Sequence, residues 1–262
     1  MKLLTSNEKL NKSDDNKFIS LGLQLYPHKI LLDSNKIKNN CPFAEKYNCF
    51  KNCVAFSGHG AYSNVKNARL EKTKLFYQDF KQFKILLESE LIKENIKAKK
   101  SGKILTVRLN TYSDLNIIKF FGDLINKYPD IIFYDYTKVI NYIYDLKKYH
   151  DKGLLKNYNI VYSYNIDDLN NKELLKNILN ITSIVLVLPL SDKNKNKDYT
   201  SFIKDKSRFL NYPIVNGDLQ DIRQERNSII CLSFKGGKQS LINEITNNNK
   251  IILPVQYLKD FS

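Results

Sequence analysis

The sequence predicts an α/β protein folded as a parallel (β/α) barrel, partial or complete and TIM-like, with a cysteine-bearing loop after the first strand. Short runs rich in Ile, Val, Tyr and Phe recur along the chain, and most are separated by stretches long enough for a helix. This alternation favours a parallel sheet with right-handed crossovers. The predicted strands are 18–26, 104–109, 131–136, 160–164, 184–188, 213–215 and 229–234.

A length of 262 residues suits one large α/β domain, which we place at residues 18–262. Residues 1–17 are rich in Asn, Lys and Asp, so we expect a disordered tail. Apolar residues at spacings of three and four predict a helical stretch from about residue 64 to 100. Further helices are expected within 114–127 and 167–179, with N-caps at Ser113-Asp114 and Asp167-Asp168.

The chain is strongly basic, with 42 Lys and Arg against 27 Asp and Glu and a formal net charge of +15. Such a charge attracts nucleic acid or anionic membranes. The lysines are scattered, however, and the abundance of Lys, Asn, Ile and Tyr is typical of an AT-rich genome. No apolar run approaches the roughly 20 residues of a membrane span, and the N-terminus is unlike a signal peptide. We therefore expect a cytoplasmic protein without a membrane partner.

Three cysteines, Cys41, Cys49 and Cys53, lie in segment 27–60, which is expected to be a loop. Clustered thiols in a cytoplasmic protein favour metal binding over disulfides, and thiolates suit iron–sulfur clusters and zinc. The interpretation we prefer is a 4Fe–4S cluster whose fourth iron stays open to a small molecule. Zinc with His59 as fourth ligand, or three unligated thiols, are the alternatives. Cys231 lies in an apolar strand and is expected in the core.

Polar side chains follow several predicted strands, at the edge of a barrel where active sites gather. Each of them has a structural alternative as a helix cap, a turn residue or one half of a buried ion pair. Their recurrence at one edge nevertheless predicts a functional site. The residues are Arg108, Asn110, Ser113, Asp114, Asp135, Lys138, Ser163, Asn165, Asp218, Asp221 and Arg223.

Five sequence blocks together resemble the phage "gene product eighty-eight" family, over about residues 18–238. More distantly, the order of blocks is similar to phage-associated proteins of the radical S-adenosylmethionine type, although the cysteine spacing differs from that of the usual radical enzymes. The blocks are Cys41-Pro…Cys49…Cys53, Arg69-x-x-Lys72-Thr73, Arg108-Leu109-Asn110-x-x-Ser113-Asp114, Phe133-Tyr134-Asp135-Tyr136-Thr137-Lys138 and Asn216-Gly217-Asp218-x-x-Asp221-x-Arg223.

The resemblance implies a barrel with a 4Fe–4S cluster on the three cysteines and S-adenosylmethionine on the open iron. On this interpretation four residues bind the cofactor, four line the substrate cavity, and two close its far side. These are, respectively, Arg108, Asn110, Ser113 and Asp114; Asp135, Lys138, Ser163 and Asn165; and Asp218 and Arg223.

We therefore expect a radical S-adenosylmethionine-like enzyme encoded by a phage or mobile element. Its basic charge favours nucleic acid or a nucleotide as substrate. One alternative is a zinc-stabilised nucleic-acid-binding protein. The other is a metal-dependent phosphoesterase in which Asp114, Asp135, Asp218 and Asp221 gather divalent ions.

Overall fold

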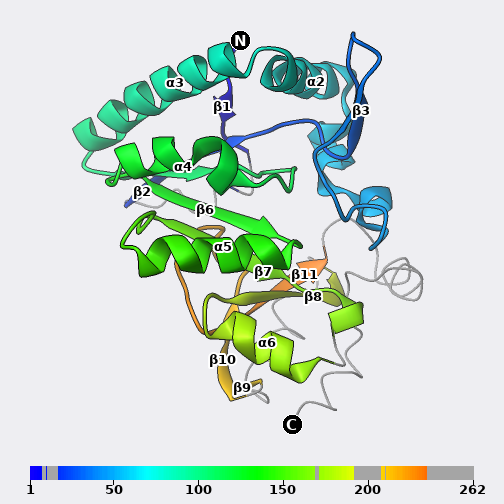
Figure 1. Cartoon of the computed structure of the whole chain (residues 1–262), viewed down its shortest axis with the longest axis vertical. Coiled ribbons are helices and arrows are strands. Elements are labelled where there is room, and N and C mark those ends of the chain that lie inside the picture. The colour runs from blue at the N-terminus through cyan, green and yellow to red at the C-terminus, as the bar shows by residue number, and fades with distance from the viewer. Residues whose placement is uncertain (8–9, 11–16, 169–170, 192–207, 210, 235–262) are drawn as a thin grey trace.

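The computed structural model describes residues 1–7, 10, 17–168, 171–191, 208–209 and 211–234 (Figure 1). All seven predicted strands are confirmed, with small shifts at their ends. The strands of the main sheet are β1 (Leu4–Thr5), β2 (Phe18–Leu23), β5 (Ile104–Arg108), β6 (Ile132–Thr137), β7 (Tyr158–Ser163), β8 (Ile184–Ser191), β9 (Arg208–Phe209), β10 (Tyr212–Asn216) and β11 (Ile229–Phe234).

These strands form one sheet in the order β1-β2-β5-β6-β7-β8-β11-β10-β9. Every pairing from β2 to β10 is parallel, whereas β1 and β9 pair antiparallel at the two edges. The predicted parallel α/β architecture is therefore confirmed. The prediction of a complete barrel is wrong for the described residues, because the two short antiparallel strands end the sheet and do not pair with each other.

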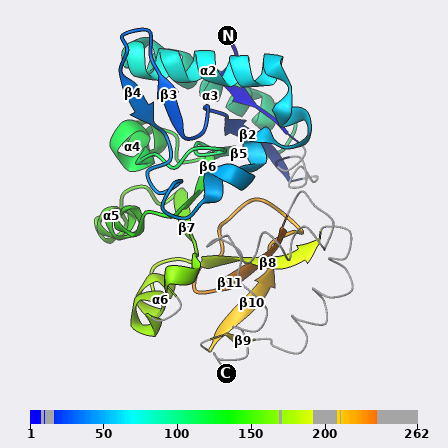
Figure 2. The ribbon, with the colours of Figure 1, turned by 90° about the vertical axis from the view of Figure 1, so that its right-hand side faces the viewer.

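In the part of the chain that the structure describes, five helices cover one face of the sheet. They are α2 (Ser63–Gln78), α3 (Phe80–Lys100), α4 (Ile117–Lys127), α5 (Ile140–Asp151) and α6 (Lys172–Leu179). Their buried apolar residues share one core with strand residues such as Val107, Phe133 and Ile160. Figure 2 shows α4, α5 and α6 in a row on one side of the sheet. Alternate strand residues, including Tyr134 and Val161, point to the opposite face.

The helical stretch predicted for residues 64–100 is two helices, which separate at Asp79. The backbone of Asp79 is not helical, and its carboxylate caps α3 by accepting a hydrogen bond from the Gln82 amide at 2.9 Å. The apolar pattern runs on through this break because Phe76, Phe80 and Phe83 pack together on both sides of it. The N-caps predicted at Ser113-Asp114 and Asp167-Asp168 are wrong. Helix α4 is capped by Asn116, and α6 is capped by Asn171.

Part of the expected N-terminal tail is ordered. Leu3, Leu4 and Leu10 are fully buried, and β1 pairs with β2. The Glu90 carboxylate accepts hydrogen bonds from the amides of Leu3 and Leu4, both at 2.7 Å, and the Lys72 amine donates to the Leu3 carbonyl at 3.1 Å. The prediction of a disordered tail is therefore wrong for Leu3, Leu4 and Leu10. Residues 8–9 and 11–16 lie outside the part of the chain that the structure describes.

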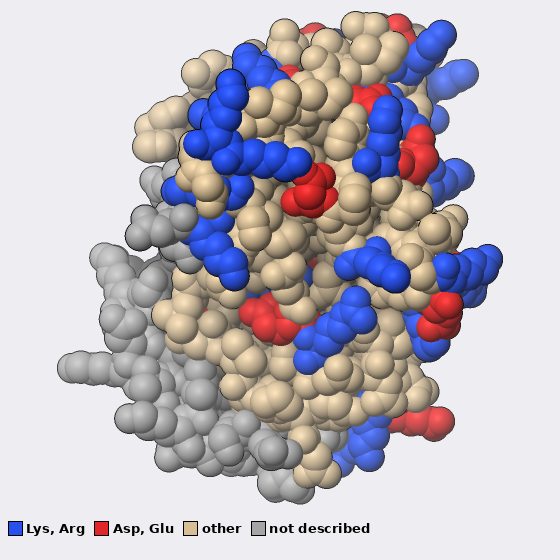
Figure 3. Space-filling view, turned by 90° about the vertical axis from the view of Figure 1, so that its left-hand side faces the viewer, with Lys and Arg blue, Asp and Glu red and all other residues tan. Residues whose placement is uncertain are grey.

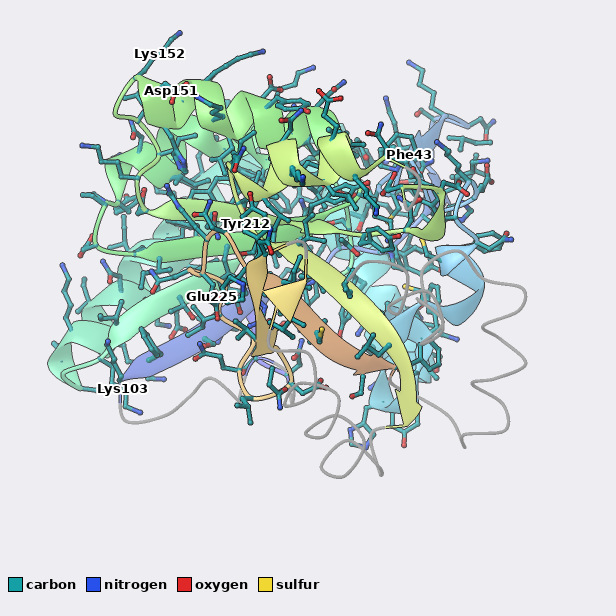
Figure 4. All side chains as sticks on the ribbon, turned by 90° about the horizontal axis from the view of Figure 1, so that it is seen from below. Phe43, Lys103, Asp151, Lys152, Tyr212 and Glu225 are labelled. Atoms are coloured by element: carbon teal, nitrogen blue, oxygen red, sulfur yellow. The ribbon has the colours of Figure 1, made fainter. Side chains whose placement is uncertain are left out.

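Segment 27–60 contains a small hairpin and three single turns: β3 (Lys29–Leu31), β4 (Ile37–Asn39), η1 (Cys49–Asn52), η2 (Val54–Phe56) and η3 (Gly58–Ala61). We call residues 40–61 the cysteine segment. It lies at the side of the molecule toward which the arrow of β6 points (Figure 1). Seen from below, Phe43 of this segment and Lys103, which precedes β5, lie at opposite ends (Figure 4). The cysteine segment therefore occupies the carboxyl edge of the sheet.

Among the described residues, no helix has the length and apolar character that crossing a membrane requires.

Candidate functional site

Asn40 fixes the cysteine segment to the rest of the fold. It is fully buried and directly precedes Cys41. Its side-chain amide donates to the Tyr26 carbonyl at 2.5 Å and accepts from the Tyr77 hydroxyl at 2.6 Å. Its carbonyl accepts from the Asp114 amide at 2.7 Å. Asn40 thus joins the chain after β2, helix α2 and the turn after β5.

The cysteine thiols are held by backbone groups. Cys41 Sγ donates to the Tyr112 carbonyl at 3.6 Å and accepts from the His28 amide at 3.4 Å. Cys49 Sγ donates to the Ala44 carbonyl at 3.6 Å. The Cys41 thiol therefore contacts the turn after β5.

The three thiols belong to one short stretch of chain, residues 41–53. Cys41, Cys49 and Cys53 are all free and half-buried. Burial raises the pKa of each thiol, that of Cys41 to about 12, and neighbouring thiolate charge raises the pKa of Cys41 and Cys49 further. A cation placed among the three would favour all of their thiolates at once.

Arg69 of α2 is a buried cation beside this group. Its guanidinium lies 4.4 Å from the centre of the Tyr112 ring and donates to the carbonyls of Ala55 at 2.5 Å and Gly60 at 3.4 Å. Among the described residues, no carboxylate is within salt-bridge distance of it, and its Nε has no hydrogen-bond partner. Its charge lowers the pKa of Cys53, which opposes the effect of burial.

Lys138 is a second cation at this edge. Its amine donates to the Ser163 carbonyl and hydroxyl, both at 3.1 Å, and to the Tyr164 carbonyl at 3.3 Å. Burial lowers the pKa of Lys138, and the charges of Cys49 and Asp114 oppose that shift. The charge of Lys138 in turn lowers the pKa of Cys49. Lys138 and Ser163 are therefore in direct contact at the ends of β6 and β7.

Asp114 links two strand ends. Its carboxylate accepts from the Thr137 hydroxyl at 2.6 Å and the Lys138 amide at 3.0 Å, and burial raises its pKa to about 6. Nearby, the Asn110 side chain accepts from the Ser113 hydroxyl at 2.8 Å. The predicted cofactor residues Asn110, Ser113 and Asp114 thus form a rigid, internally bonded turn.

Asp135 and Asn165 are bonded inside the protein. Asp135 accepts from the Asn110 amide at 2.5 Å and the Tyr158 hydroxyl at 3.1 Å, and burial raises its pKa to about 7. Asn165 donates to the Asp168 carboxylate at 2.6 Å. The carboxylates of Asp135 and Asp168 therefore both accept hydrogen bonds from donors within the protein.

A separate polar cluster lies on the face of the sheet opposite the helices. Asp221 pairs with Arg108 at 3.3 Å and accepts from the hydroxyls of Tyr134 at 3.0 Å and Tyr136 at 3.2 Å. Arg223 donates to the Tyr136 hydroxyl at 2.7 Å. Arg108 and Arg223 thus belong to this cluster and are not brought to the thiols.

The Asp218 carboxylate accepts from the Ser233 amide at 2.8 Å and hydroxyl at 2.7 Å, and the carbonyl of the preceding Gly217 accepts from Arg223 of the opposite-face cluster at 2.6 Å. Tyr112 contacts both Arg69, whose guanidinium lies over its ring, and Cys41, whose thiol bonds to its carbonyl. Sequence analysis assigned no role to Asn40, Arg69 or Tyr112. Only Arg69 carried a signal, as the first residue of a family block.

Within the described ranges, no three or more His, Cys, Asp or Glu side chains gather closely enough to hold a single metal ion. His59 is exposed and stacks on the Tyr62 ring, with the ring centres 5.5 Å apart. Cys231 is fully buried, as predicted. A four-iron cluster binds each thiolate to a different iron, so its ligands lie farther apart than those of one ion. The three thiols fit such a cluster in donor type.

A family model described as Gene product 88 matches residues 1–250. The chain belongs to the Gene product 88 family. No curated protein and no solved structure is significantly similar to it. The resemblance noted from the sequence blocks is thus confirmed for the Gene product 88 family, and the comparisons give no support to a relationship with radical S-adenosylmethionine proteins.

Replacing Asn40 with alanine should destabilise this member of the Gene product 88 family. Asn40→Ala leaves the Tyr26 carbonyl and the Tyr77 hydroxyl without their buried partner, and each such loss costs about 1–3 kcal/mol. We expect the free energy of unfolding in urea to fall by about 2–4 kcal/mol. The exposed Asn64→Ala control should stay within about 0.5 kcal/mol of wild type, and equal stability of the two variants would contradict the anchoring role.

Stability should also fall as pH rises through the raised pKa of Asp135. A carboxyl whose pKa is higher in the folded protein binds more protons there, so folding is progressively disfavoured above the unfolded value, until the pH passes the folded value of about 7. We expect wild type to lose more unfolding free energy than Asp135→Asn between about pH 4 and pH 7. Parallel pH profiles in urea unfolding would show that Asp135 is not the group responsible.

Proposed function

We propose that this protein is an iron–sulfur enzyme in which Cys41, Cys49 and Cys53 hold a four-iron cluster at the carboxyl edge of the sheet. The observation that carries the proposal is that one short segment supplies three thiols and is fixed to the turn after β5, through Cys41 Sγ to the Tyr112 carbonyl and the Asn40 carbonyl to the Asp114 amide. A soft donor thus lies next to the polar strand end that carries Asp114.

The charges around the thiols support this proposal. Arg69 and Lys138 are cations at least half removed from water, and burying a cation without a counter-charge is unfavourable. No carboxylate of the described residues forms an ion pair with Arg69. Thiolates that bind a cluster would supply negative charge next to both cations.

Three protein ligands would leave one iron open, and the cluster would supply a binding and electron-transfer position for a small molecule there. Lys138, held by Ser163, would face an anionic group of that molecule at the same edge. S-adenosylmethionine is our proposed cofactor on the basis of the sequence resemblance alone. The residues first assigned to it, Arg108, Asn110, Ser113 and Asp114, have partners within the protein, as described above.

The proposal of a nucleic acid or nucleotide substrate depends on net charge. In Figure 3, Lys and Arg form a band at the upper left of one face, and elsewhere on that face they are mixed with Asp and Glu. A band of positive charge attracts any polyanion or acidic protein, so it does not by itself select nucleic acid. No specific observation favours the zinc or phosphoesterase alternatives, since the described carboxylates and His59 do not converge on a metal-ion group.

The test is the iron and sulfide content of protein purified without oxygen, together with its visible absorption. We expect wild type to contain both elements and Cys49→Ala to lose them, because one of three cluster ligands is removed. Cys231→Ala is the matched control, since it removes a buried cysteine of the core and should retain iron and sulfide. Stoichiometric zinc in wild type, or equal metal content in Cys49→Ala and wild type, would overturn the proposal.

A further inference from the structure

The outer face of helix α3 carries an exposed apolar stripe. Ile85, Ile92 and Ile96 are 53%, 43% and 50% exposed. Their spacings of seven and four place them on one side of the helix. The opposite side of α3, with Phe83, Leu87 and Leu91, is buried in the main core. The stripe is therefore additional to the face that holds the helix on the sheet.

Lysines flank this stripe without acidic partners. Among the described residues, no carboxylate lies within salt-bridge distance of Lys81, Lys93, Lys97 or Lys100, all of which are exposed. We call these four lysines and the three isoleucines the α3 crest.

The glutamates of α3 all have partners, and one of them, Glu88, lies beside the stripe, three residues after Ile85 and four before Ile92. Glu88 pairs with Lys127, Glu94 pairs with Lys2, and Glu90 accepts the amides of Leu3 and Leu4. Two lysines of α3 also form ion pairs: Lys84 pairs with Asp123, and Lys99 pairs with Asp130. The crest therefore presents three isoleucines and four lysines beside a Glu88 carboxylate that is already paired with Lys127.

We infer that the α3 crest docks an acidic amphipathic helix of a partner protein. Isoleucines at heptad-like spacing match the positions that interlock between packed helices, and charges beside such a seam select the partner. Among the described residues, the flanking charges of α3 that form no ion pair are those of the four crest lysines, so the complementary helix carries glutamate or aspartate at the facing positions.

The crest suits other occupants less well. In a second copy of this chain, the crest lysines would meet other crest lysines, while Glu88 of each copy is already paired with Lys127, so the contact is repulsive. Helices that lie on membranes bury a broad apolar face, often with Trp, Phe or Leu. The crest has three isoleucines in a narrow row, roughly 16 Å long at 1.5 Å per residue.

The experiment measures binding of a fluorescent synthetic three-heptad peptide, with Leu at a and d and Glu at e and g, by anisotropy. We expect it to bind wild type, and to bind Ile92→Ser/Ile96→Ser and Lys93→Glu/Lys97→Glu about tenfold or more weakly. All substituted side chains are exposed, so urea unfolding should show that both variants stay folded.

Two controls separate docking from general attraction to a basic protein. Lys152→Glu/Lys156→Glu makes the same charge change at exposed lysines outside the crest and should keep wild-type affinity. A peptide with Lys at e and g should bind Lys93→Glu/Lys97→Glu better than wild type. Equal losses in the two lysine variants, no peptide binding to wild type, or crest-dependent binding only to phosphatidylglycerol–phosphatidylcholine vesicles would each overturn the inference.

Discussion

The arrangement of the candidate site depends on the hydrogen bonds through which Asn40 and Asp114 join the cysteine segment to the strand ends. The amide of Asp114 bonds to the carbonyl of Asn40, while its carboxylate bonds to Thr137 and Lys138 after β6. Asn40 meanwhile ties the segment to the chain after β2 and to α2. The cysteine segment has little regular structure of its own, so these buried contacts, more than its short turns, determine where the thiols lie.

The parallel sheet provides the second constraint. Its carboxyl ends meet at one edge, which brings Lys138 and Ser163 to the side where the loop after β2 emerges. The alternation of side chains across the sheet sends Arg108 and Tyr136 to the other face, where Asp221 pairs with them. Removing one member of such a buried pair leaves an uncompensated charge, so this cluster holds segment 217–227 against the sheet. Polar residues close in sequence therefore serve two different faces.

Much of the sheet could be predicted from the sequence because strand residues are concentrated in short apolar runs with turn signals between them. The break at Asp79 and the docking of Leu3 and Leu4 could not, since both depend on partners distant in sequence, such as Glu90. The position of the cysteine segment at the carboxyl edge could be predicted because this segment directly follows the first strand of a parallel sheet. Asn40 and Tyr112 were missed because Asn and Tyr are frequent throughout this chain, and nothing local distinguishes a buried anchor from a surface residue. Asn110 and Ser113 had the residue types of a binding site, yet their side chains bond to each other.

The central claim is that three thiols at this edge share one iron–sulfur cluster. The most direct measurement is the anomalous scattering at the iron edge from crystals of the full chain grown without oxygen. The account predicts one compact iron feature in contact with Sγ of Cys41, Cys49 and Cys53. Zinc bound by these thiols, or iron bound without them, would contradict it.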